Sequence, residues 1–416
     1  KEIRLVLSAF IGSVLIASIC SVIYLLIHPV HNIREISLFI SHIRFSLCLD
    51  LGIVLALHNT FKEKENPLWL KIIFLVIAIW FTLYLFIAQT LTGIVLLLIL
   101  AIVYLLYVWQ QHHQNNSIKW VAYSIAIFLF LVSGYLLTIT YQYFHLKEPD
   151  SSIDQNIKTQ QGNEYAFDNG SIIENGSRIG NYVCNRELQE AWQTKSHEAF
   201  DPITEATLIR FLNSKGLRKD AQSVYTLSDK EIQYIENNIA NIDYTRHFGI
   251  KRSLYPIFFS FSLYQKSGEI NESTLLQRIE LWKTSLEIIQ QHPWLGVGIG
   301  DQKEELNLVL LQHDSAMKEK KDYGCHNQFL TYWLIGGIGL LLYFIFTLVA
   351  PFFYSTKKLN FLYLSFFIIM IISMLTEDTL ETQAGITLYA FFNSFFLFIY
   401  GNSNKQSIIT NKKITK

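Results

Sequence analysis

Charged residues are scarce in this sequence: they make up 16% of the 416 residues, and the formal net charge is zero. Without a basic excess the chain lacks the electrostatic signature of a nucleic-acid-binding protein, so no nucleic-acid partner is expected. Apolar residues instead make up 51%, including 30 Phe and 22 Tyr. That is too apolar for an ordinary soluble protein of this length, so the composition predicts a membrane protein.

Common patterns of cofactor and hydrolase sites are also absent. We find no closely spaced His and Asp set of the metal-ligand type and no nucleophile elbow. Gly296, Gly298 and Gly300 lack both the preceding strand and the spacing of a dinucleotide loop. Cys325 beside His326 is a weak signal for a thiol nucleophile, because adjacent side chains project in different directions. Neither a metal nor another cofactor is therefore expected.

Long apolar runs supply the main structural signal. Crossing the hydrocarbon core takes about 20 mostly apolar residues in a helix. Such runs lie at residues 5–27, 36–58, 68–88, 91–110, 118–141, 329–353, 359–376 and 382–400. They predict an all-α polytopic membrane protein with about eight transmembrane helices. No cleavable signal peptide is evident, and because the first residue is Lys1 we expect earlier helices to be missing.

Charge is concentrated in one long segment. Residues 142–328 hold 26 of the 34 acidic and 20 of the 34 basic residues. We therefore expect an N-terminal membrane bundle of about five helices (1–141), a polar loop domain (142–328), a C-terminal bundle of three helices (329–400) and a tail (401–416). With the tail in the cytoplasm, the short inner segments carry eleven Lys and Arg, against Arg34 alone outside. This bias places the loop domain outside, in the periplasm of a double-membrane bacterium.

The loop domain itself is expected to be mostly helical. Ser228 and Glu231 form a capping box, and residues 213–216 end in the Gly of a helix stop. Residues 254–263 are aromatic but too short to cross, which predicts a position in the bilayer interface. Cys184 and Cys325 would share the oxidising compartment and could pair.

Polar groups that interrupt or border the apolar runs are candidates for function. By the orientation above, four segments bring such groups to the outer membrane face: His42 and Arg44; Gln89, Thr90 and Thr92; His326 and Asn327; and Glu377, Asp378 and Glu381. Each also has a structural interpretation. Arg44 could reach lipid headgroups, the deeper Asp50 could be a hydrogen-bonding group in the bundle, His326 could anchor its helix, and the acids could form a solvated turn.

Residues 278–339 combine several motifs. Arg278 is followed four positions on by Trp282, which could also be a stacked surface pair. A turn reading His292-Pro293-Trp294-Leu295-Gly296-Val297-Gly298 follows, then His326-Asn327 and a helix with Gly336, Gly337 and Gly339. This segment resembles the O-antigen ligase/polymerase superfamily. The similarity extends from residues 42–47 to Ala384-Gly385, and residues 208–220 look like versions from the Bacteroidetes.

The resemblance implies a GT-C-like membrane glycosyltransferase of the bacterial inner membrane, inverting and metal-independent. Its donor would be an undecaprenyl-diphosphate-linked glycan and its acceptor lipid A-core, a glycan or a protein, with membrane lipids around it. An essential His and essential loop arginines are implied, and His326 and Arg278 match residue by residue. The family often has Ser-Arg-Gly where residues 89–93 contain no Arg, so Arg210 and Arg44 compete as the second phosphate ligand.

Such a reaction leaves a multiply anionic diphosphate and needs a base for the acceptor hydroxyl. Arginine binds phosphate oxygens through its planar fork and stays charged when partly desolvated, and histidine titrates in the right range. We therefore interpret His326 and Arg278 as catalytic. The expected donor-binding or glycan-binding residues are Arg210, Arg44, His42, Lys251, Arg252, Asn327 and Glu377.

Several functions stay open at this point. Ligase, glycan polymerase and protein O-oligosaccharyltransferase share the same chemistry. A transporter of lipid-linked sugars could also use intramembrane His and Arg, but it would usually show repeated halves and helices interrupted at the midplane. A structural anchor for the outer domain is disfavoured by Arg44 and Asp50 within a span.

Overall fold

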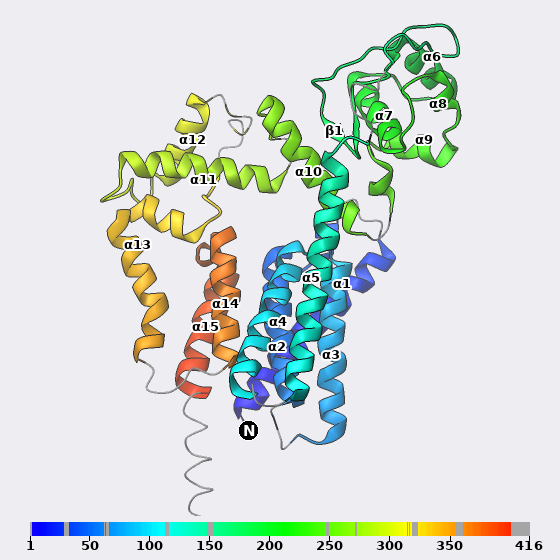
Figure 1. Cartoon of the computed structure of the whole chain (residues 1–416). Coiled ribbons are helices and arrows are strands. Elements are labelled where there is room, and N and C mark those ends of the chain that lie inside the picture. Colours follow the sequence, from blue (N-terminus) through cyan, green and yellow to red (C-terminus); the bar gives the residue numbers. More distant parts are fainter. Residues whose placement is uncertain are drawn as a thin grey trace, which may run out of the picture. The chain divides into compact units, whose positions relative to one another are not determined.

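The computed structural model describes residues 2–28, 33–61, 63, 66–112, 116–147, 154–246, 249–270, 273–313, 315, 317, 323–354 and 361–400 (Figure 1). It is mostly helical. The chain divides into two compact units, one formed by Lys1–Ala122 with Arg278–Lys416 and the other by Tyr123–Gln277. The predicted domain boundaries at residues 141 and 328 stay predictions, and the predicted tail lies outside the described residues.

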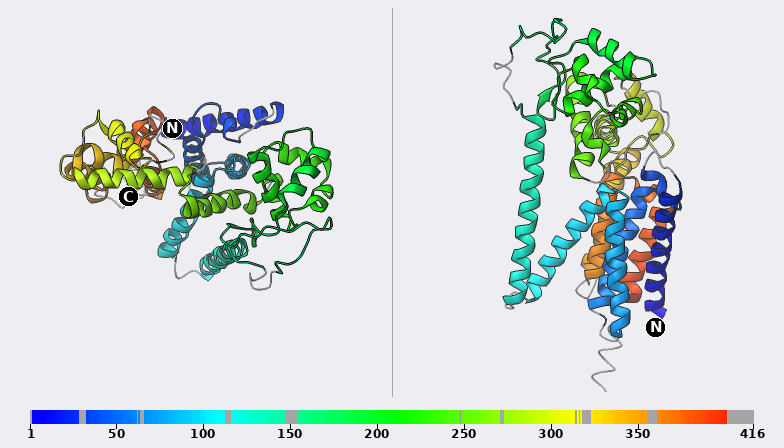
Figure 2. Two further views of the ribbon diagram at one scale, coloured as in Figure 1. Left: turned by 90° about the horizontal axis from the view of Figure 1, so that it is seen from above. Right: turned by 90° about the vertical axis from the view of Figure 1, so that its right-hand side faces the viewer.

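The first unit begins with four apolar helices, which Figure 2 shows from two further directions: α1 (Glu2–Ile27), α2 (His42–Phe61), α3 (Leu68–Ile87) and α4 (Leu91–His112). The central helix, α2, contacts α1, α3, α4 and α14 (Phe361–Thr376). Residues 45–47 and 49–56 of α2 are all buried. Gly52 lets the Phe81 ring of α3 pack directly on its backbone, because an added Cβ would lie 2.7 Å from that ring. Helix α2 is therefore the core of this bundle.

The start of α2 differs from the prediction. The expected run began at residue 36, but Ile33–Ile36 form a short 3₁₀ helix (η1), and α2 begins only at His42. Apolar composition at Leu38, Phe39 and Ile40 extended the predicted run too far, since composition alone does not distinguish an apolar loop from a helix. His42 and Arg44 consequently lie in the first turn of α2.

The C-terminal part of the first unit contains α11 (Thr274–Gln291), α12 (Gln302–Gln312) and α13 (Gln328–Tyr354), followed by α14. A 3₁₀ turn, η4 (Thr379–Glu381), then leads to α15 (Gln383–Ser394) and a π-helical turn, η5 (Phe395–Tyr400). Helix α13 is broken at Gly337, whose φ of 67° and ψ of −171° are not helical. The break divides α13 into residues 328–336 and 338–354.

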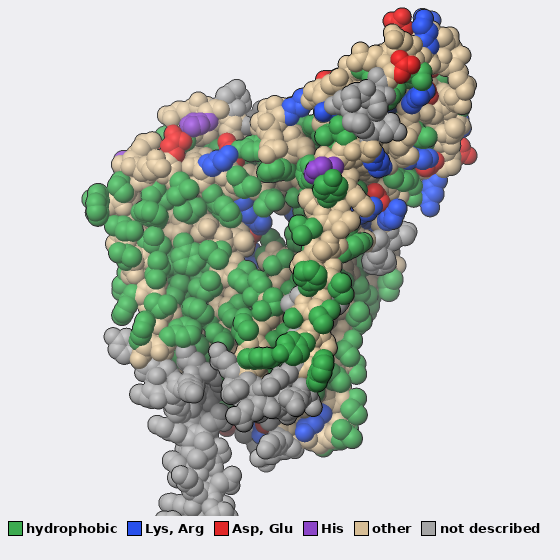
Figure 3. Space-filling model, in the orientation of Figure 1, with side chains coloured by type: hydrophobic (Ala, Val, Ile, Leu, Met, Phe, Trp, Pro, Cys, Tyr) green, Lys and Arg blue, Asp and Glu red, His purple; other side chains and the backbone are tan. Residues whose placement is uncertain are grey.

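Among the described residues, five helices are long and apolar enough to cross a membrane: Glu2–Ile27, His42–Phe61, Leu68–Ile87, Leu91–Trp109 and Gln328–Phe353. They correspond to five of the eight predicted runs. The other three runs are also largely helical, in α5 (Asn116–Phe144), in the shorter α14 and in α15 with η5. Hydrophobic side chains cover the visible surface over α13 and neighbouring helices (Figure 3). These helices make the chain a polytopic membrane protein, and the number eight stays a prediction.

The second unit is built from short helices on a small apolar core. Its elements after α5 are β1 (Ile173–Glu174), β2 (Ser177–Arg178), α6 (Asn185–Lys195), α7 (Pro202–Ser214), α8 (Ala221–Tyr225), α9 (Asp229–Glu236), η3 (Ile242–Thr245) and α10 (Ile250–Ser267). Trp192, Phe211 and Val224 are fully buried in its core. The capping box of Ser228 and Glu231 is present, and Gly216 ends α7 with a φ of 71°. Both local predictions are confirmed.

Two features of this unit were predicted less completely. The strands β1 and β2 form a two-stranded antiparallel hairpin that the sequence did not reveal, because each strand has only two residues. Val183 forms isolated bridges with Ala166 and Lys219. Residues 254–263 lie within α10, whose Tyr255 and Phe258 pack on Tyr143. Their expected position in the bilayer interface stays a prediction.

Candidate active site

The turn after α11 is bonded to the break in α13. The backbone N–H of Val297 donates to the Leu334 carbonyl oxygen (2.8 Å), and that of Gly298 donates to Ile335 (3.1 Å). In return, Ile338 N–H donates to the Pro293 carbonyl oxygen (2.9 Å). Carbonyls freed by a helix break in an apolar environment must find donors, and this turn supplies them. The motif of Pro293 to Gly298 therefore joins the helix that carries Arg278 to the helix that follows His326.

Glycines make this close approach possible. At Gly337, with its positive φ, an added Cβ would collide with the Trp294 carbonyl oxygen. At Gly296, with a φ of 68°, it would collide with the Leu334 carbonyl oxygen. Only glycine combines this backbone conformation with no side chain to displace. The Gly-rich pattern of residues 296–298 and 336–337 thus serves backbone packing.

The main chain of His326 is held on both sides. His326 precedes α13 with a φ of 50°, a left-handed conformation that is uncommon outside Gly and Asn. One Asp378 carboxylate oxygen accepts its backbone N–H (2.9 Å), and the other accepts the Asn327 N–H (3.1 Å) and the Thr331 hydroxyl (2.6 Å). The indole N–H of Trp282 donates to the His326 carbonyl oxygen (3.3 Å). These contacts fix a strained residue, which is common at functional sites.

Glu377 joins the two candidate catalytic side chains. One of its carboxylate oxygens accepts from the Arg278 guanidinium, and the other faces His326 Nδ1 at 3.3 Å. The side chains of Arg278 and Glu377 are 18% and 11% exposed, whereas that of His326 is 40% exposed. The base is therefore accessible while its partners are largely buried.

The charge state of Glu377 decides the histidine tautomer. Burial alone would raise the pKa of Glu377, but the hydrogen bond from His326 and the charge of Arg278 outweigh burial and lower it. An ionised carboxylate can only accept, so Nδ1 carries a proton, and in the neutral imidazole the lone pair is on Nε2. Within the described part of the chain, no hydrogen-bond partner meets Nε2. The arrangement presents Nε2 as a proton acceptor beside an arginine.

The comparison with known families bears on this same segment. Residues 245–345 match the family model of the O-antigen ligases. This segment is similar to the O-antigen ligases. The match contains Arg278, the turn and His326, and it confirms the resemblance to the O-antigen ligase/polymerase superfamily. It covers less than half of the chain and ends before Glu377 and Asp378. No curated protein matches the chain.

Two further predicted residues, His42 and Arg44, lie in the same unit as Arg278 and His326, and among the described residues they make no bond to either. His42 Nδ1 lies 3.1 Å from the Ser37 hydroxyl, and Arg44 donates to the Ser41 hydroxyl at 3.0 Å. Arg44 Nε is buried with no hydrogen-bond partner among the described residues. Of the four segments expected to converge, the structure directly joins those of His326 and Glu377. The placement of a donor phosphate near Arg44 stays a prediction.

Asn327 has a structural role at the start of α13. Its side-chain oxygen accepts the N–H groups of Phe329 (3.0 Å) and Leu330 (3.2 Å), which caps α13. Its amide group donates to the Leu375 carbonyl oxygen (3.1 Å) at the end of α14. These bonds use the side-chain oxygen and one of the two amide N–H groups, so capping gives Asn327 a structural role, and its expected contact with a glycan stays a prediction.

The other three candidate cations, Arg210, Lys251 and Arg252, lie in the second unit. Lys251 and Arg252 also fall within the matched residues 245–345. Arg210 makes two hydrogen bonds to Glu174, at 2.9 and 3.0 Å, and its guanidinium lies over the Phe259 ring. Glu174 is fully buried and also accepts from Asn241 (2.9 Å). A phosphate would have to compete with this buried carboxylate for Arg210. Pairing with Glu174 thus gives Arg210 a role within its own unit.

Lys251 and Arg252 lie in the first turn of α10. The Lys251 ammonium is 5.7 Å from the centre of the Tyr255 ring, and Arg252 donates to the Arg246 carbonyl oxygen at 2.8 Å. Their expected contact with a diphosphate or a headgroup stays a prediction.

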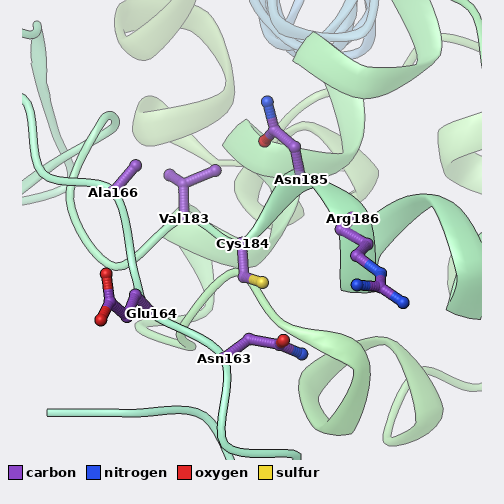
Figure 4. A pocket seen from close by; sticks show the side chains of 7 residues that line it. All are labelled: Asn163, Glu164, Ala166, Val183, Cys184, Asn185 and Arg186. Atoms are coloured by element: carbon purple, nitrogen blue, oxygen red, sulfur yellow. The ribbon is translucent and has the colours of Figure 1, made fainter.

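A shallow hollow in the second unit is lined by Asn163, Glu164, Ala166, Val183, Cys184, Asn185 and Arg186 (Figure 4). It contains no residue of the predicted site.

All four cysteines are free thiols in the structure. Cys184 lies in one unit and Cys325 in the other, and their expected pairing stays a prediction. Cys325 is fully buried, and burial raises the pKa of its thiol to about 11, far from what a reactive thiolate needs.

In the parts of the chain that the structure describes, no group of three His, Cys, Asp or Glu side chains could hold a metal ion.

Asp378 and Trp282 are the functional neighbours that the sequence singled out least. Asp378 was expected only as part of a polar outer turn, and Trp282 only as the partner of Arg278. In the structure both side chains form hydrogen bonds with the backbone of His326. The Trp282 bond joins residues 44 positions apart and the Asp378 bond joins residues 52 positions apart, and no local sequence pattern predicts such pairings. The sole signal was the unusual pair of adjacent acids directly after an apolar run.

Proposed function

We propose that the protein is a glycosyltransferase of the bacterial inner membrane that transfers a glycan from undecaprenyl diphosphate to an acceptor hydroxyl on the periplasmic face. The Arg278–Glu377–His326 group carries the proposal. It combines a cation suited to phosphate with a base whose free nitrogen is accessible, inside a segment that matches the O-antigen ligases. Apolar helices suit a lipid-linked donor.

The reaction assigns a role to each member. The acceptor oxygen forms a bond to the anomeric carbon, and the bond between that carbon and the diphosphate oxygen breaks, with inversion at the carbon. The acceptor proton passes to His326 Nε2. Arg278 stabilises the negative charge of the departing diphosphate through its planar fork. Glu377 holds the imidazole with Nε2 toward the acceptor and is the counter-ion that the diphosphate replaces at Arg278.

The decisive test is transfer by the purified full chain in lipid vesicles containing a synthetic undecaprenyl-diphosphate glycan, with EDTA present. Three acceptors are offered: lipid A-core, a second donor molecule and a Ser/Thr peptide. The acceptor that is consumed distinguishes a ligase from a polymerase and from a protein glycosyltransferase. No transfer to any acceptor by well-folded protein would contradict the proposal and favour a transporter.

The informative variant is His326→Asn. Asn tolerates the positive φ at this position better than Ala does, so the variant removes the base with little added backbone strain. We expect transfer to fall by about 10²- to 10⁴-fold, the usual contribution of a general base. The control is His313→Ala, which removes an exposed histidine paired with Glu287 in the same unit. Near-normal transfer by His326→Asn, or an equal loss in the control, would overturn the assignment.

A further inference from the structure

The turn between α11 and α12 exposes an apolar tip. Residues 293–300 read Pro-Trp-Leu-Gly-Val-Gly-Ile-Gly and carry no charge. Trp294, Leu295 and Ile299 are 76%, 86% and 83% exposed. Three large apolar side chains so exposed within six residues are unusual on a surface that faces only water. The tip therefore marks a contact with an apolar partner.

The conformation of this tip is fixed by the protein. The three backbone hydrogen bonds to Leu334, Ile335 and Ile338 tie the turn to α13, and Val297 packs on the small core of Ile288, Leu306 and Leu334. Val297 points inward, whereas its neighbours Leu295 and Ile299 are exposed. The N–H groups of Gly296, Val297 and Gly298 and the Pro293 carbonyl are paired, which lowers the cost of placing this part of the turn in an apolar medium.

The attachment point indicates which partner this is. The turn binds α13 at the break where residues 338–354 begin, and these form the greater part of a helix apolar enough to cross a membrane. Trp is typical of the boundary between hydrocarbon and water. Directly after Ile299 and Gly300, the chain turns charged at Asp301, Lys303 and Glu304, which are exposed. The change from apolar tip to charged helix is what a segment at the membrane boundary requires.

We propose that residues 293–299 insert into the outer leaflet of the lipid bilayer, with Trp294, Leu295 and Ile299 in contact with lipid. The partner is the bilayer rather than a second copy of the chain, because the turn is bonded to the break in α13, within a helix apolar enough to cross a membrane. The turn continues from α11 and is bonded to α13, so its insertion sets the depth of Arg278 and His326. If the proposed function holds, that depth is the level of the donor's diphosphate.

The test measures the surroundings of single spin labels and needs no activity. Cys20, Cys48, Cys184 and Cys325 are replaced by Ser or Ala, and one label is placed by Leu295→Cys, Ile299→Cys or, as control, Glu304→Cys on α12. The labelled chain is reconstituted in phosphatidylethanolamine and phosphatidylglycerol vesicles. Relaxation by oxygen, which concentrates in lipid, is compared with relaxation by a water-soluble nickel chelate.

We expect oxygen to dominate at positions 295 and 299 and nickel to dominate at 304. Equal access of nickel to all three positions would overturn the proposal. So would spin–spin broadening at 295 that disappears on dilution with unlabelled protein, since that result shows contact between copies. Should the cysteine-free chain fail to fold, Trp294→Phe in the natural sequence gives the same answer. The variant must then lose part of the tryptophan quenching caused by brominated lipids, and unchanged quenching contradicts insertion.

Discussion

At the scale of single residues, the site depends on two adjacent acids with separate tasks. Asp378 binds the backbone at residues 326–327, and Glu377 binds the side chains of His326 and Arg278. A residue held at a φ of 50° has an intrinsic cost of about 1–3 kcal/mol. Asp378 offsets that cost with charge-assisted hydrogen bonds, which are stronger than neutral ones. The strained position is thereby made compatible with a stable fold.

Glu377→Gln should separate charge from shape. The variant keeps the size of the side chain but loses the ion pair with Arg278, and we expect transfer to fall by about ten- to a hundredfold, as when other histidines lose an orienting partner. Glu287→Gln, which affects the exposed pair with His313, is the matched control and should transfer normally. Unaltered transfer by Glu377→Gln would refute the role of the carboxylate.

The same variant tests the pH dependence of stability. The pKa of Glu377 is lowered in the folded protein, so its stabilising contribution is complete above the ordinary Glu pKa of about 4.3. That contribution is lost as pH falls through the lowered folded value. The difference in melting temperature between the natural protein and Glu377→Gln should therefore narrow on acidification below about pH 4.3. A difference that is constant with pH would contradict the lowered pKa.

At the scale of elements, the break in α13 and the turn bound to it form one structural feature. Gly337→Ala should strain the backbone by about 1–3 kcal/mol and also displace the Trp294 carbonyl. We expect a lower melting temperature in detergent and reduced transfer. Gly339→Ala is the control, because open space surrounds its added Cβ. If both variants melt alike, the proposed packing at the break is wrong.

Local sequence rules predicted the elements better than the bonds between them. The capping box at Ser228 and the stop at Gly216 depend on neighbours within four residues, and both are confirmed. The break at Gly337 was not predicted, since an isolated glycine in an apolar run fits an intact membrane helix equally well. Its cause lies about 40 residues earlier, in a turn whose N–H groups replace the helical donors.

At the scale of the whole molecule, the candidate residues are distributed over two compact units: Arg278, His326 and Glu377 lie in the first and Arg210 in the second. Composition and charge distribution predicted a polytopic membrane protein with a separate polar part, because both depend on long stretches of chain. The topology also predicted that His326 and Glu377 lie on one face, and they are in contact. The assignment of Arg210 to phosphate could not be tested from sequence, since its partner Glu174 lies 36 residues away in a two-residue strand.

Arg210→Ala distinguishes a stabilising residue from a phosphate ligand. Removing the guanidinium leaves the fully buried Glu174 unpaired, which typically costs about 3–5 kcal/mol. We expect a large loss of protease resistance in residues 123–277. Arg218→Ala, which removes an exposed arginine 5.1 Å from the Tyr182 ring, should change little. A stable Arg210→Ala protein that fails in transfer would instead support phosphate binding.

The bonds between the turn and α13 also determine how this protein can be recombined with its relatives. A chimera that exchanges α13 alone would bring carbonyls at Leu334 and Ile335 without their donors, and a Gly337 break without the Trp294 carbonyl that fits it. Exchanging the turn alone would fail for the reciprocal reason. Residues 293–338 therefore have to be exchanged together, and homologous exchange should succeed only when its junctions fall outside that span.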